Sequence, residues 1–246
     1  MSRQRSLPLD YRERYNFASF VTCGQNLVAF ETVRDMAFRR PGGVVFIHGP
    51  AGVGKSHLLH AFRDELEVRG GQAPFMDWRE SDGLDRTFPA SGLNTLNEFR
   101  FQVEVAACAV MDNMDQLPAV PELHHALVSI LNRLAMDGGC VLAAGRLHPA
   151  EIATIDDHVR SRLLSGITMS ISHPDAEMRE ELLRKLAGDR GILLPDLAVS
   201  YVLTRCPRDI GSLVRIVRAI DRKSMEEGRN ISAPLVRSVV DAMFLA

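Results

Sequence analysis

The feature that most constrains this chain is a glycine-rich run that joins an apolar strand pattern at residues 44–47 to an amphipathic helix pattern. It fills every fixed position of the phosphate-loop motif GxxxxGK[ST]. In such a loop, backbone N–H groups converge on phosphate oxygens, the lysine reaches the β and γ phosphates, and the hydroxyl can ligate Mg²⁺. A glycine-rich turn with a chance lysine is the alternative, but the flanking strand and helix favour a site for a nucleoside di- or triphosphate. The run consists of Gly49, Pro50, Ala51, Gly52, Val53, Gly54, Lys55 and Ser56.

Strand and helix patterns alternate through the first two-thirds of the chain. Short apolar runs bounded by turn residues predict strands, and longer amphipathic segments that end at glycine pairs predict helices. The alternation predicts an α/β fold with an open parallel sheet flanked by helices. The predicted strands are 44–47, 73–78, 105–111, 140–144 and 167–171, and the predicted helices are 55–69, 93–100 and 120–136.

Only helical periodicity remains after Pro174, where four segments bounded by proline or glycine predict a small second domain. We therefore expect a flexible N-terminal tail at 1–15, an α/β nucleotide-binding base at 16–172 and an all-helical lid at 173–246. The hinge is expected near Ser172, His173 and Pro174. The predicted lid helices are 175–188, 196–205, 208–225 and 233–244.

Composition narrows the function classes. A chain of 246 residues with 46% hydrophobic content can bury a large core. Its net charge of −2 does not supply the concentrated basic surface that duplex DNA usually requires, so DNA is expected only as an indirect partner. No apolar stretch is long enough to span a bilayer, and no signal-peptide core opens the sequence. We therefore expect a soluble cytoplasmic protein without a membrane partner.

The four cysteines, Cys23, Cys108, Cys140 and Cys206, are far apart and form no CxxC pair. Two of them fall inside apolar runs that are typical of core strands. Reduced cysteines that pack in the core therefore explain the pattern better than a zinc site or disulfides.

A second nucleotide signal follows the apolar run that ends at Met111. Asp112 stands at the carboxyl end of a predicted central strand, where ligands bind in open α/β sheets, and it can hold Mg²⁺ through water. A strand that simply ends at a polar turn is the alternative. Phosphate-loop ATPases that hydrolyse well usually place an acid at the next position, but this chain has Asn113, which cannot take a proton. We therefore expect slow hydrolysis by this protein alone.

After the phosphate loop, the continuation His57-Leu58-Leu59-His60-Ala61 resembles the AAA+ module of the bacterial replication initiator DnaA. Three weaker matches follow in the same order along the chain. Residues 16–21 with Asn26 are similar to the segment beside the adenine, residues 159–163 to the arginine-finger box, and residues 207–210 to the start of the sensor 2 helix. Over about residues 16–246, the resemblance implies an AAA+ base and lid that bind ADP or ATP with Mg²⁺.

The resemblance also assigns residue roles. It implies that His57 lies beside the nucleotide, that Arg208 contacts the nucleotide in the same chain, and that Arg162 acts as an arginine finger in a neighbouring subunit. A surface arginine paired with Asp156 or Asp157 is the alternative for Arg162. For Arg208, the alternative is a salt bridge at the start of its helix.

Two features narrow the resemblance within that family. The initiator's C-terminal DNA-binding domain and N-terminal domain are not evident, and the chain instead begins with a segment that resembles the QxSLPL peptide that docks on the replicative sliding clamp. An extended segment with two leucine anchors and a proline suits a preformed pocket. This architecture resembles the Hda group of DnaA-related proteins. The predicted contact residues are Gln4, Ser6, Leu7, Pro8 and Leu9.

That resemblance implies a negative regulator of replication initiation. The protein would dock on the DNA polymerase III sliding clamp (its beta subunit) and stimulate hydrolysis of ATP bound to DnaA through Arg162. Its own ATPase activity would be minor, and it could form a homo-oligomer. The alternative is an ATPase similar to DnaC or IstB that loads a helicase or assists another DNA transaction.

Some positions depart from the family pattern. The predicted strand at 140–144 is not followed by the expected polar sensor 1 residue, although Arg146 could substitute for it. His158 stands where the initiator's box carries an arginine. Arg215, Arg218 and Arg222 share one helical face, for which a solvated surface is favoured over a contact with DNA or an acidic partner.

Overall fold

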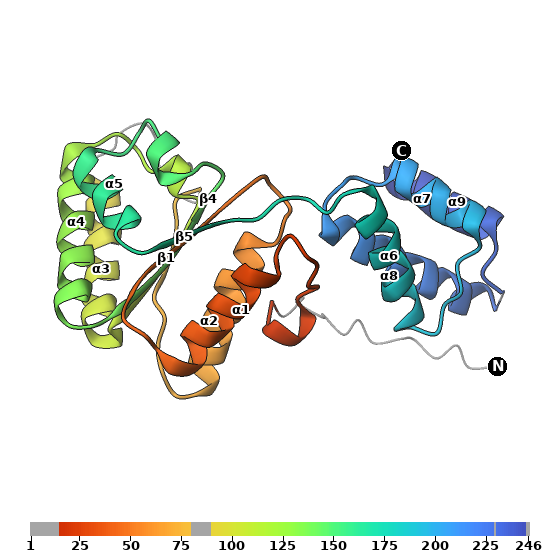
Figure 1. Cartoon of the computed structure of the whole chain (residues 1–246), viewed down its shortest axis with the longest axis horizontal. Coiled ribbons are helices and arrows are strands. Elements are labelled where there is room, and N and C mark those ends of the chain that lie inside the picture. The colour runs from red at the N-terminus through yellow and green to blue at the C-terminus, as the bar shows by residue number, and fades with distance from the viewer. Residues whose placement is uncertain (1–14, 80–89, 229, 245–246) are drawn as a thin grey trace.

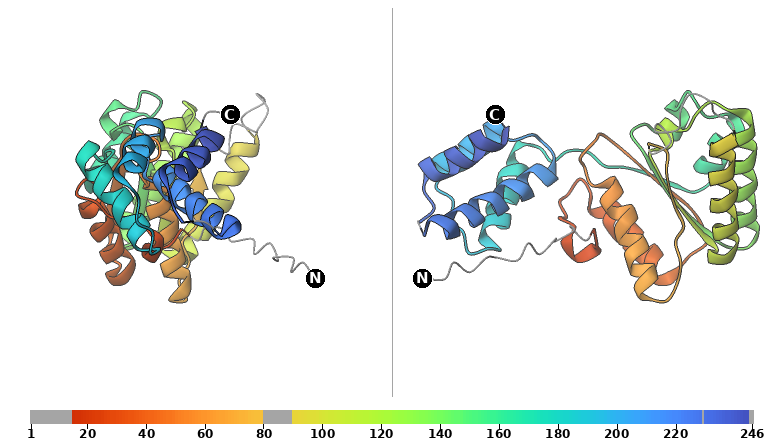
Figure 2. Two further views of the ribbon diagram at one scale, coloured as in Figure 1. Left: turned by 90° about the vertical axis from the view of Figure 1, so that its right-hand side faces the viewer. Right: turned by 180° about the vertical axis from the view of Figure 1, so that it is seen from behind.

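The computed structural model describes residues 15–79, 90–228 and 230–244. Figure 1 shows an α/β base joined by an extended segment to a separate group of helices, the lid. Along the long axis, the layer of α3 and α4 comes first, followed by the sheet, the layer of α1 and α2, and finally the lid (Figures 1 and 2). The described residues therefore form a three-layer base with a lid beyond the α1 and α2 layer.

The sheet of the described residues contains five parallel strands in the order β2-β3-β4-β1-β5. Every neighbouring pair of strands is parallel, so the carboxyl ends of all five strands meet at one edge. This confirms the predicted open parallel sheet. The strands are β1 (Gly43–His48), β2 (Phe75–Asp77), β3 (Cys108–Asp112), β4 (Cys140–Gly145) and β5 (Ile167–Ser170).

Helices cover both faces of this sheet (Figure 1). Two of them cover one face and three the other, and short 3-10 turns at Phe17–Ser19, Met114–Gln116 and Pro149–Glu151 connect elements. Because both faces are covered, β3 and β4 are buried at every position, as expected for central parallel strands. The helices are α1 (Leu27–Arg39), α2 (Lys55–Val68), α3 (Ala90–Ala106), α4 (Pro121–Met136) and α5 (Asp157–Leu164).

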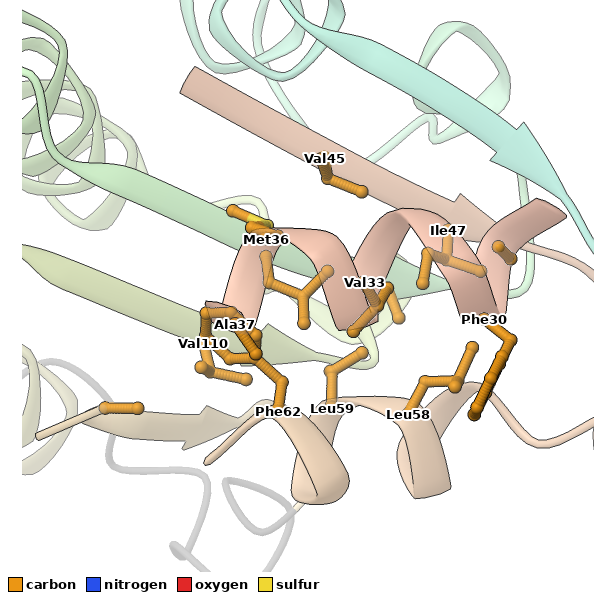
Figure 3. Packing of buried hydrophobic residues seen from close by; sticks show 14 of the residues in the cluster. Phe30, Val33, Met36, Ala37, Val45, Ile47, Leu58, Leu59, Phe62 and Val110 are labelled. Atoms are coloured by element: carbon orange, nitrogen blue, oxygen red, sulfur yellow. The ribbon is translucent and has the colours of Figure 1, made fainter. Parts of the chain in front are cut away.

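The core between the sheet and the α1 and α2 layer fixes the helix that follows the phosphate loop. Leu58, Leu59 and Phe62 of α2 are fully buried, because their helical spacing puts them on the face that meets the sheet. Figure 3 shows these side chains against Val33 of α1 and Val110 of β3. This packing holds the start of α2 at the carboxyl edge of the sheet.

The described part of the lid contains four helices with a hydrophobic core of their own. Leu183, Val202, Leu213 and Val236 come one from each helix and are fully buried. Asp175 and Asp209 cap the first and third helices by accepting hydrogen bonds from backbone N–H groups. The predicted helical lid is therefore confirmed. Its helices are α6 (Ala176–Gly188), α7 (Asp196–Arg205), α8 (Ile210–Glu227) and α9 (Ala233–Phe244).

The strand predicted over residues 105–111 is wrong at its start, and the helix predicted over 93–100 is too short. Helix α3 continues to Ala106, and Ala107 then adopts a left-handed conformation with φ 52° before β3 begins. Phe99 and Val103 are buried four residues apart, whereas Val105 is exposed. A short apolar run does not by itself distinguish a strand from a helix end, so the pattern was ambiguous there.

Helix α1 was not predicted, although its apolar residues have helical spacing. Ala29, Phe30, Val33 and Met36 are all buried against the sheet and α2. This spacing is typical of an amphipathic helix, so α1 could have been predicted from the sequence.

All four cysteines are buried free thiols, as predicted. Burial raises the pKa of the Cys206 thiol to about 11, so this group stays protonated at neutral pH. In the described parts of the chain, no helix combines the length and apolar content needed to cross a bilayer.

We expect Phe62→Ala to lower the free energy of unfolding by about 3–5 kcal/mol, because a fully buried ring is replaced by a cavity. Val68→Ala, at an exposed position of the same helix, is the control and should change it by less than about 0.5 kcal/mol. Urea titrations followed by circular dichroism would measure both. Similar losses in the two variants would contradict the assigned packing of α2.

Candidate functional site

The phosphate loop runs from the end of β1 to the start of α2. Gly54 precedes the first helical residue with φ 104°, a conformation that L side chains rarely adopt, so glycine is required there. Gly52 has φ 79°, and a side chain added to it would meet the Asp209 Cβ atom of the lid at 2.6 Å. The loop therefore presents the free N–H groups of a helix N-terminus, with the lid close against it.

Lys55, the first residue of α2, is buried within the loop. Its Nζ atom donates hydrogen bonds to the backbone oxygens of Gly49 at 2.7 Å and Pro50 at 2.8 Å. Burial lowers the pKa of the Lys55 ammonium group, and the carboxylates of Asp112 and Asp115 oppose that shift. An ammonium group held in this position can serve as a point charge for phosphate oxygens.

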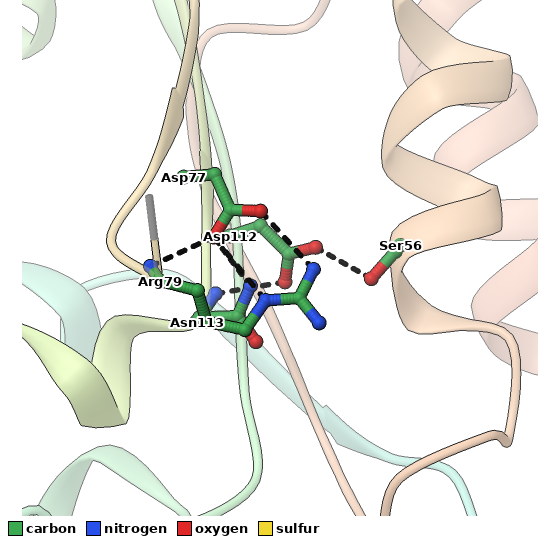
Figure 4. Close-up of polar contacts among 5 residues, drawn as sticks. All are labelled: Ser56, Asp77, Arg79, Asp112 and Asn113. Atoms are coloured by element: carbon green, nitrogen blue, oxygen red, sulfur yellow. Dashed lines mark hydrogen bonds and ion pairs between the residues drawn. The ribbon is translucent and has the colours of Figure 1, made fainter. Parts of the chain in front are cut away.

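Ser56 and Asp112 meet at the carboxyl edge of the sheet (Figure 4). The Ser56 hydroxyl donates a 2.5 Å hydrogen bond to Asp112 Oδ2, and Asp112 Oδ1 accepts from the backbone N–H of Asn113 at 2.8 Å. A hydroxyl and a carboxylate are hard oxygen ligands, which suit Mg²⁺ held together with a nucleotide's phosphates. No cluster of three or more His, Cys, Asp or Glu side chains that could hold a metal alone occurs among the described residues.

A pocket of about 550 Å³ opens over the phosphate loop. Its walls come from the loop, from the segment before α1, from the ends of β2, β3 and β4, and from helix α8 of the lid. The resemblance implied a base and a lid that bind a nucleotide together, and the pocket is lined by residues of both. The residues of the loop and of the start of α2 that line it are Ala51, Gly52, Val53, Gly54, Lys55, Ser56 and His57.

The predicted loop residues have different positions relative to this pocket. Those from Ala51 to His57 line it, whereas Gly49 and Pro50 contribute the carbonyl oxygens that hold Lys55. Asp112 lies behind Ser56 and is 1% exposed. The predicted nucleotide ligands are thus brought together, except on the lid side.

On the lid side of the pocket, Arg208 does not have the position that the resemblance implied. Arg208 is exposed and is not among the described residues that line the pocket, whereas Arg215 and Arg218 of α8 are. Arg215 donates to the Ser212 hydroxyl at 2.7 Å, which in turn donates to Asp209 Oδ2 at 2.6 Å. Arg215 and Arg218 are both exposed, as expected for the face that they share with Arg222, and they also line the pocket. Helical spacing indicated the shared face but not its place at the pocket.

The segment before α1 forms another wall, as the resemblance implied for residues 16–21. Asn16 and Ser19 bond each other in a capping box, and Nε2 of His57 lies 3.0 Å from the Asn16 carbonyl and 3.2 Å from the Ser19 hydroxyl. The ring of Phe20 contacts His57 edge-on. His57 thus ties this segment to α2 and is itself part of the pocket lining.

Two polar residues at the end of β2 were missed by the sequence analysis. Asp77 hydrogen-bonds to Asn113, the residue after Asp112, and it pairs with Arg79, which lines the pocket (Figure 4). An aspartate directly after a short strand pattern is the signal that could have indicated them. Arg146, the substitute considered for sensor 1, also lines the pocket, and its backbone N–H donates to Asp115 at 2.6 Å.

Arg162 lies on α5, which packs on the sheet face opposite α1 and α2. It is exposed, and it makes no side-chain hydrogen bond or ion pair with any residue in the described ranges. Asp157 pairs instead with Arg160, and Asp156 caps the helix by accepting from the Val159 N–H. The alternative pairing for Arg162 is therefore not found in the structure.

The predicted clamp-binding residues Gln4, Ser6, Leu7, Pro8 and Leu9 lie outside the described residues, so their role stays a prediction.

Family profiles match almost the whole described chain. Residues 11–170 match the profile of the bacterial DnaA ATPase domain, and residues 175–240 match that of the Hda lid domain. The chain is 32% identical over 182 residues to the chromosomal replication initiator protein DnaA of Brucella abortus, and equally to that of Brucella suis. These matches cover 72% of this chain and 36% of each relative, so the chain spans about a third of their length.

Several solved structures have a similar fold, and two of them are DnaA structures. Domain III of Thermotoga maritima DnaA is 18% identical with a TM-score of 0.74 and covers 94% of this chain and 98% of that one. AMPPCP-bound DnaA from Aquifex aeolicus is 21% identical with the same score and covers 87% and 67%. At these identities the likeness concerns the fold, and it agrees with a sheet and lid of this type.

We expect Lys55→Ala to weaken binding of fluorescent ADP by about tenfold or more, because a hydrogen bond to a charged group contributes about 1.5–3 kcal/mol. Arg63→Ala is the control, since Arg63 lies on the same helix in an exposed ion pair with Glu67. Fluorescence anisotropy would measure both affinities. Equal affinity of the Lys55 variant and the wild type would show that the loop is not the nucleotide site.

Proposed function

We propose that this chain, which belongs to the bacterial DnaA family of AAA+ ATPases, binds ADP or ATP with Mg²⁺ and activates hydrolysis of ATP on another family member, DnaA. The observation that supports this proposal most directly is the difference in position between the basic side chains at the pocket and Arg162. Lys55, Arg215 and Arg218 line its own pocket, whereas Arg162 is exposed on α5 and is not committed to a carboxylate of the described residues. Such an arginine is available to a partner.

Nucleotide binding is supported by the phosphate loop, its buried lysine and the Ser56–Asp112 pair beneath the pocket. Bound Mg²⁺ would supply charge neutralisation for the phosphates, with Ser56 and Asp112 as the residues that hold it. Asn113 at the carboxyl end of β3 can accept or donate a hydrogen bond but cannot take a proton from water. This supports slow turnover by the chain's own site.

Action on DnaA is supported by chemistry at α5. A guanidinium group placed beside the γ-phosphate of a neighbouring subunit stabilises the charge that develops in the transition state. Arg160, two residues earlier, donates to the backbone oxygens of Ile152 and Ile155 and so fixes the loop before the helix. A rigid α5 would present Arg162 in a constant position.

Docking on the sliding clamp rests on the sequence of the tail alone. Residues 4–9 combine a polar head with leucine anchors and a proline, which suits an extended peptide in a preformed pocket. Clamp bound to DNA would then bring the protein to the replicated DNA without a DNA-binding surface of its own. We place this activity in the cytoplasm.

We expect Arg162→Ala to bind fluorescent ADP normally and to lose the stimulation of phosphate release from ATP-loaded DnaA. Arginine fingers raise the rate of hydrolysis by about 10³–10⁵. Arg133→Ala, which removes another exposed arginine of the base, should stimulate like the wild type. A reconstituted assay with clamp and DNA would measure release. Full stimulation by the Arg162 variant would remove this residue from the mechanism.

We expect Leu7→Ala/Leu9→Ala to abolish retention on immobilised clamp, because the two leucines are the proposed apolar anchors, and to leave ADP binding unchanged, because neither is a proposed nucleotide ligand. A pull-down compared with the wild type measures this. ATP-dependent binding of single-stranded DNA without clamp retention would instead support the loader function of DnaC- or IstB-like ATPases.

A further inference from the structure

Among the polar side chains at the ends of β2 and β3, the proposed function uses Asp112 and Asn113 but gives no role to Asp77 or Arg79. Asp77 and Asp112 are paired in the parallel register of these two strands, so both side chains stand at the same edge of the sheet. Asp112 contacts Ser56, while Asp77 contacts Asn113 and Arg79 (Figure 4). Two carboxylates therefore stand side by side, and only one of them faces the phosphate loop.

Asp77 is committed to its neighbours through both oxygens. Oδ1 accepts from Asn113 Nδ2 at 2.7 Å and from the backbone N–H of Arg79 at 3.0 Å, and Oδ2 accepts from Arg79 Nη2 at 3.1 Å. Burial by itself would raise the pKa of Asp77, but the hydrogen bonds from Arg79 and Asn113 outweigh it and hold the pKa below its usual range. The side chain is 13% exposed and remains ionised.

The ionised carboxylate decides how the Asn113 amide is oriented. A carboxylate can only accept hydrogen bonds, so the amide's NH₂ group must face Asp77. Asn113 is held further by its left-handed backbone at φ 56° and by its N–H bond to Asp112. Since Asn113 lines the pocket, its carbonyl oxygen is the group that it offers to a molecule there.

We infer that Asp77 is a positioning residue of the nucleotide site. Its carboxylate fixes both Asn113 and Arg79 at the pocket, and it lies on the strand next to the one where an acid is missing after Asp112. The inference rests on the proposed nucleotide binding. A water near the phosphates can donate a hydrogen bond to the Asn113 carbonyl oxygen, but it finds no proton acceptor there. The acid thus stands one strand away from the position where it would promote hydrolysis, and slow turnover becomes a property of the Asp77–Asn113 pair.

The arrangement has a consequence for engineering. Asn113→Asp alone would place a second carboxylate 2.7 Å from Asp77, where like charges repel and the hydrogen bond is lost. In the exchanged variant Asp77→Asn/Asn113→Asp, the amide of residue 77 can donate to the new carboxylate and still accept from the Arg79 N–H. The exchange therefore keeps the contact and moves the acid to the position after Asp112.

The test compares the wild type, Asn113→Asp and the exchanged double variant, each as the full chain. Thermal unfolding without nucleotide should show a lower melting temperature for Asn113→Asp and recovery in the double variant. Asn97→Asp makes the same chemical change at an exposed position of α3 and should melt like the wild type. Recovery is the readout that a pair of independent substitutions would not give.

Activity supplies the second readout. The double variant should hydrolyse ATP at least about tenfold faster than the wild type, a small share of the 10²–10⁴ that general bases contribute. An Asn113→Asp variant that melts like the wild type and matches the double variant in turnover would overturn the inference. Failure of the wild type to bind ADP would contradict the proposed function. The melting temperatures would still test whether Asp77 and Asn113 interact.

Discussion

The hydrogen bond between Ser56 and Asp112 is the contact on which the rest of the site depends. It ties the first turn of α2 to the end of β3, and it can form only because β1 and β3 end at the same edge of a parallel sheet. The buried face of α2 holds the helix start at that edge. Lys55, the loop N–H groups and Asn113 are then arranged around one pocket, and Asp209 brings the lid to its rim.

Arginine and lysine side chains at the pocket come from both the base and the lid, whereas Arg162 lies elsewhere on the base. Lys55, Arg146, Arg215 and Arg218 line the pocket, where a polyphosphate could be neutralised from the loop and from the lid together. Arg162 stands on the other sheet face, on a helix fixed by the contacts of Arg160. The chain thus carries cations at its own pocket, and Arg162, which lies away from that pocket, is the residue proposed to act on a nucleotide of a partner.

The sequence predicted those parts of the site that follow from local order along the chain. The loop, Lys55 and Ser56 are adjacent in the sequence and form one motif, and the apolar run before Asp112 indicated its strand. The lid contacts could not be predicted in this way. Arg208, which precedes α8, was expected at the nucleotide, whereas the residues of that helix that line the pocket include Arg215 and Arg218.

The sequence by itself determined the α/β base, the helical lid and the phosphate loop, because hydrophobic period and glycine placement act over a few residues. The tertiary structure decided which side chains meet across the sheet edge. The Asp77–Asn113 pair joins residues 36 positions apart, and only the β2–β3 register brings them within hydrogen-bond distance. It also decided where α3 ends, since the left-handed turn at Ala107 and the burial of Phe99 and Val103 depend on packing against the sheet.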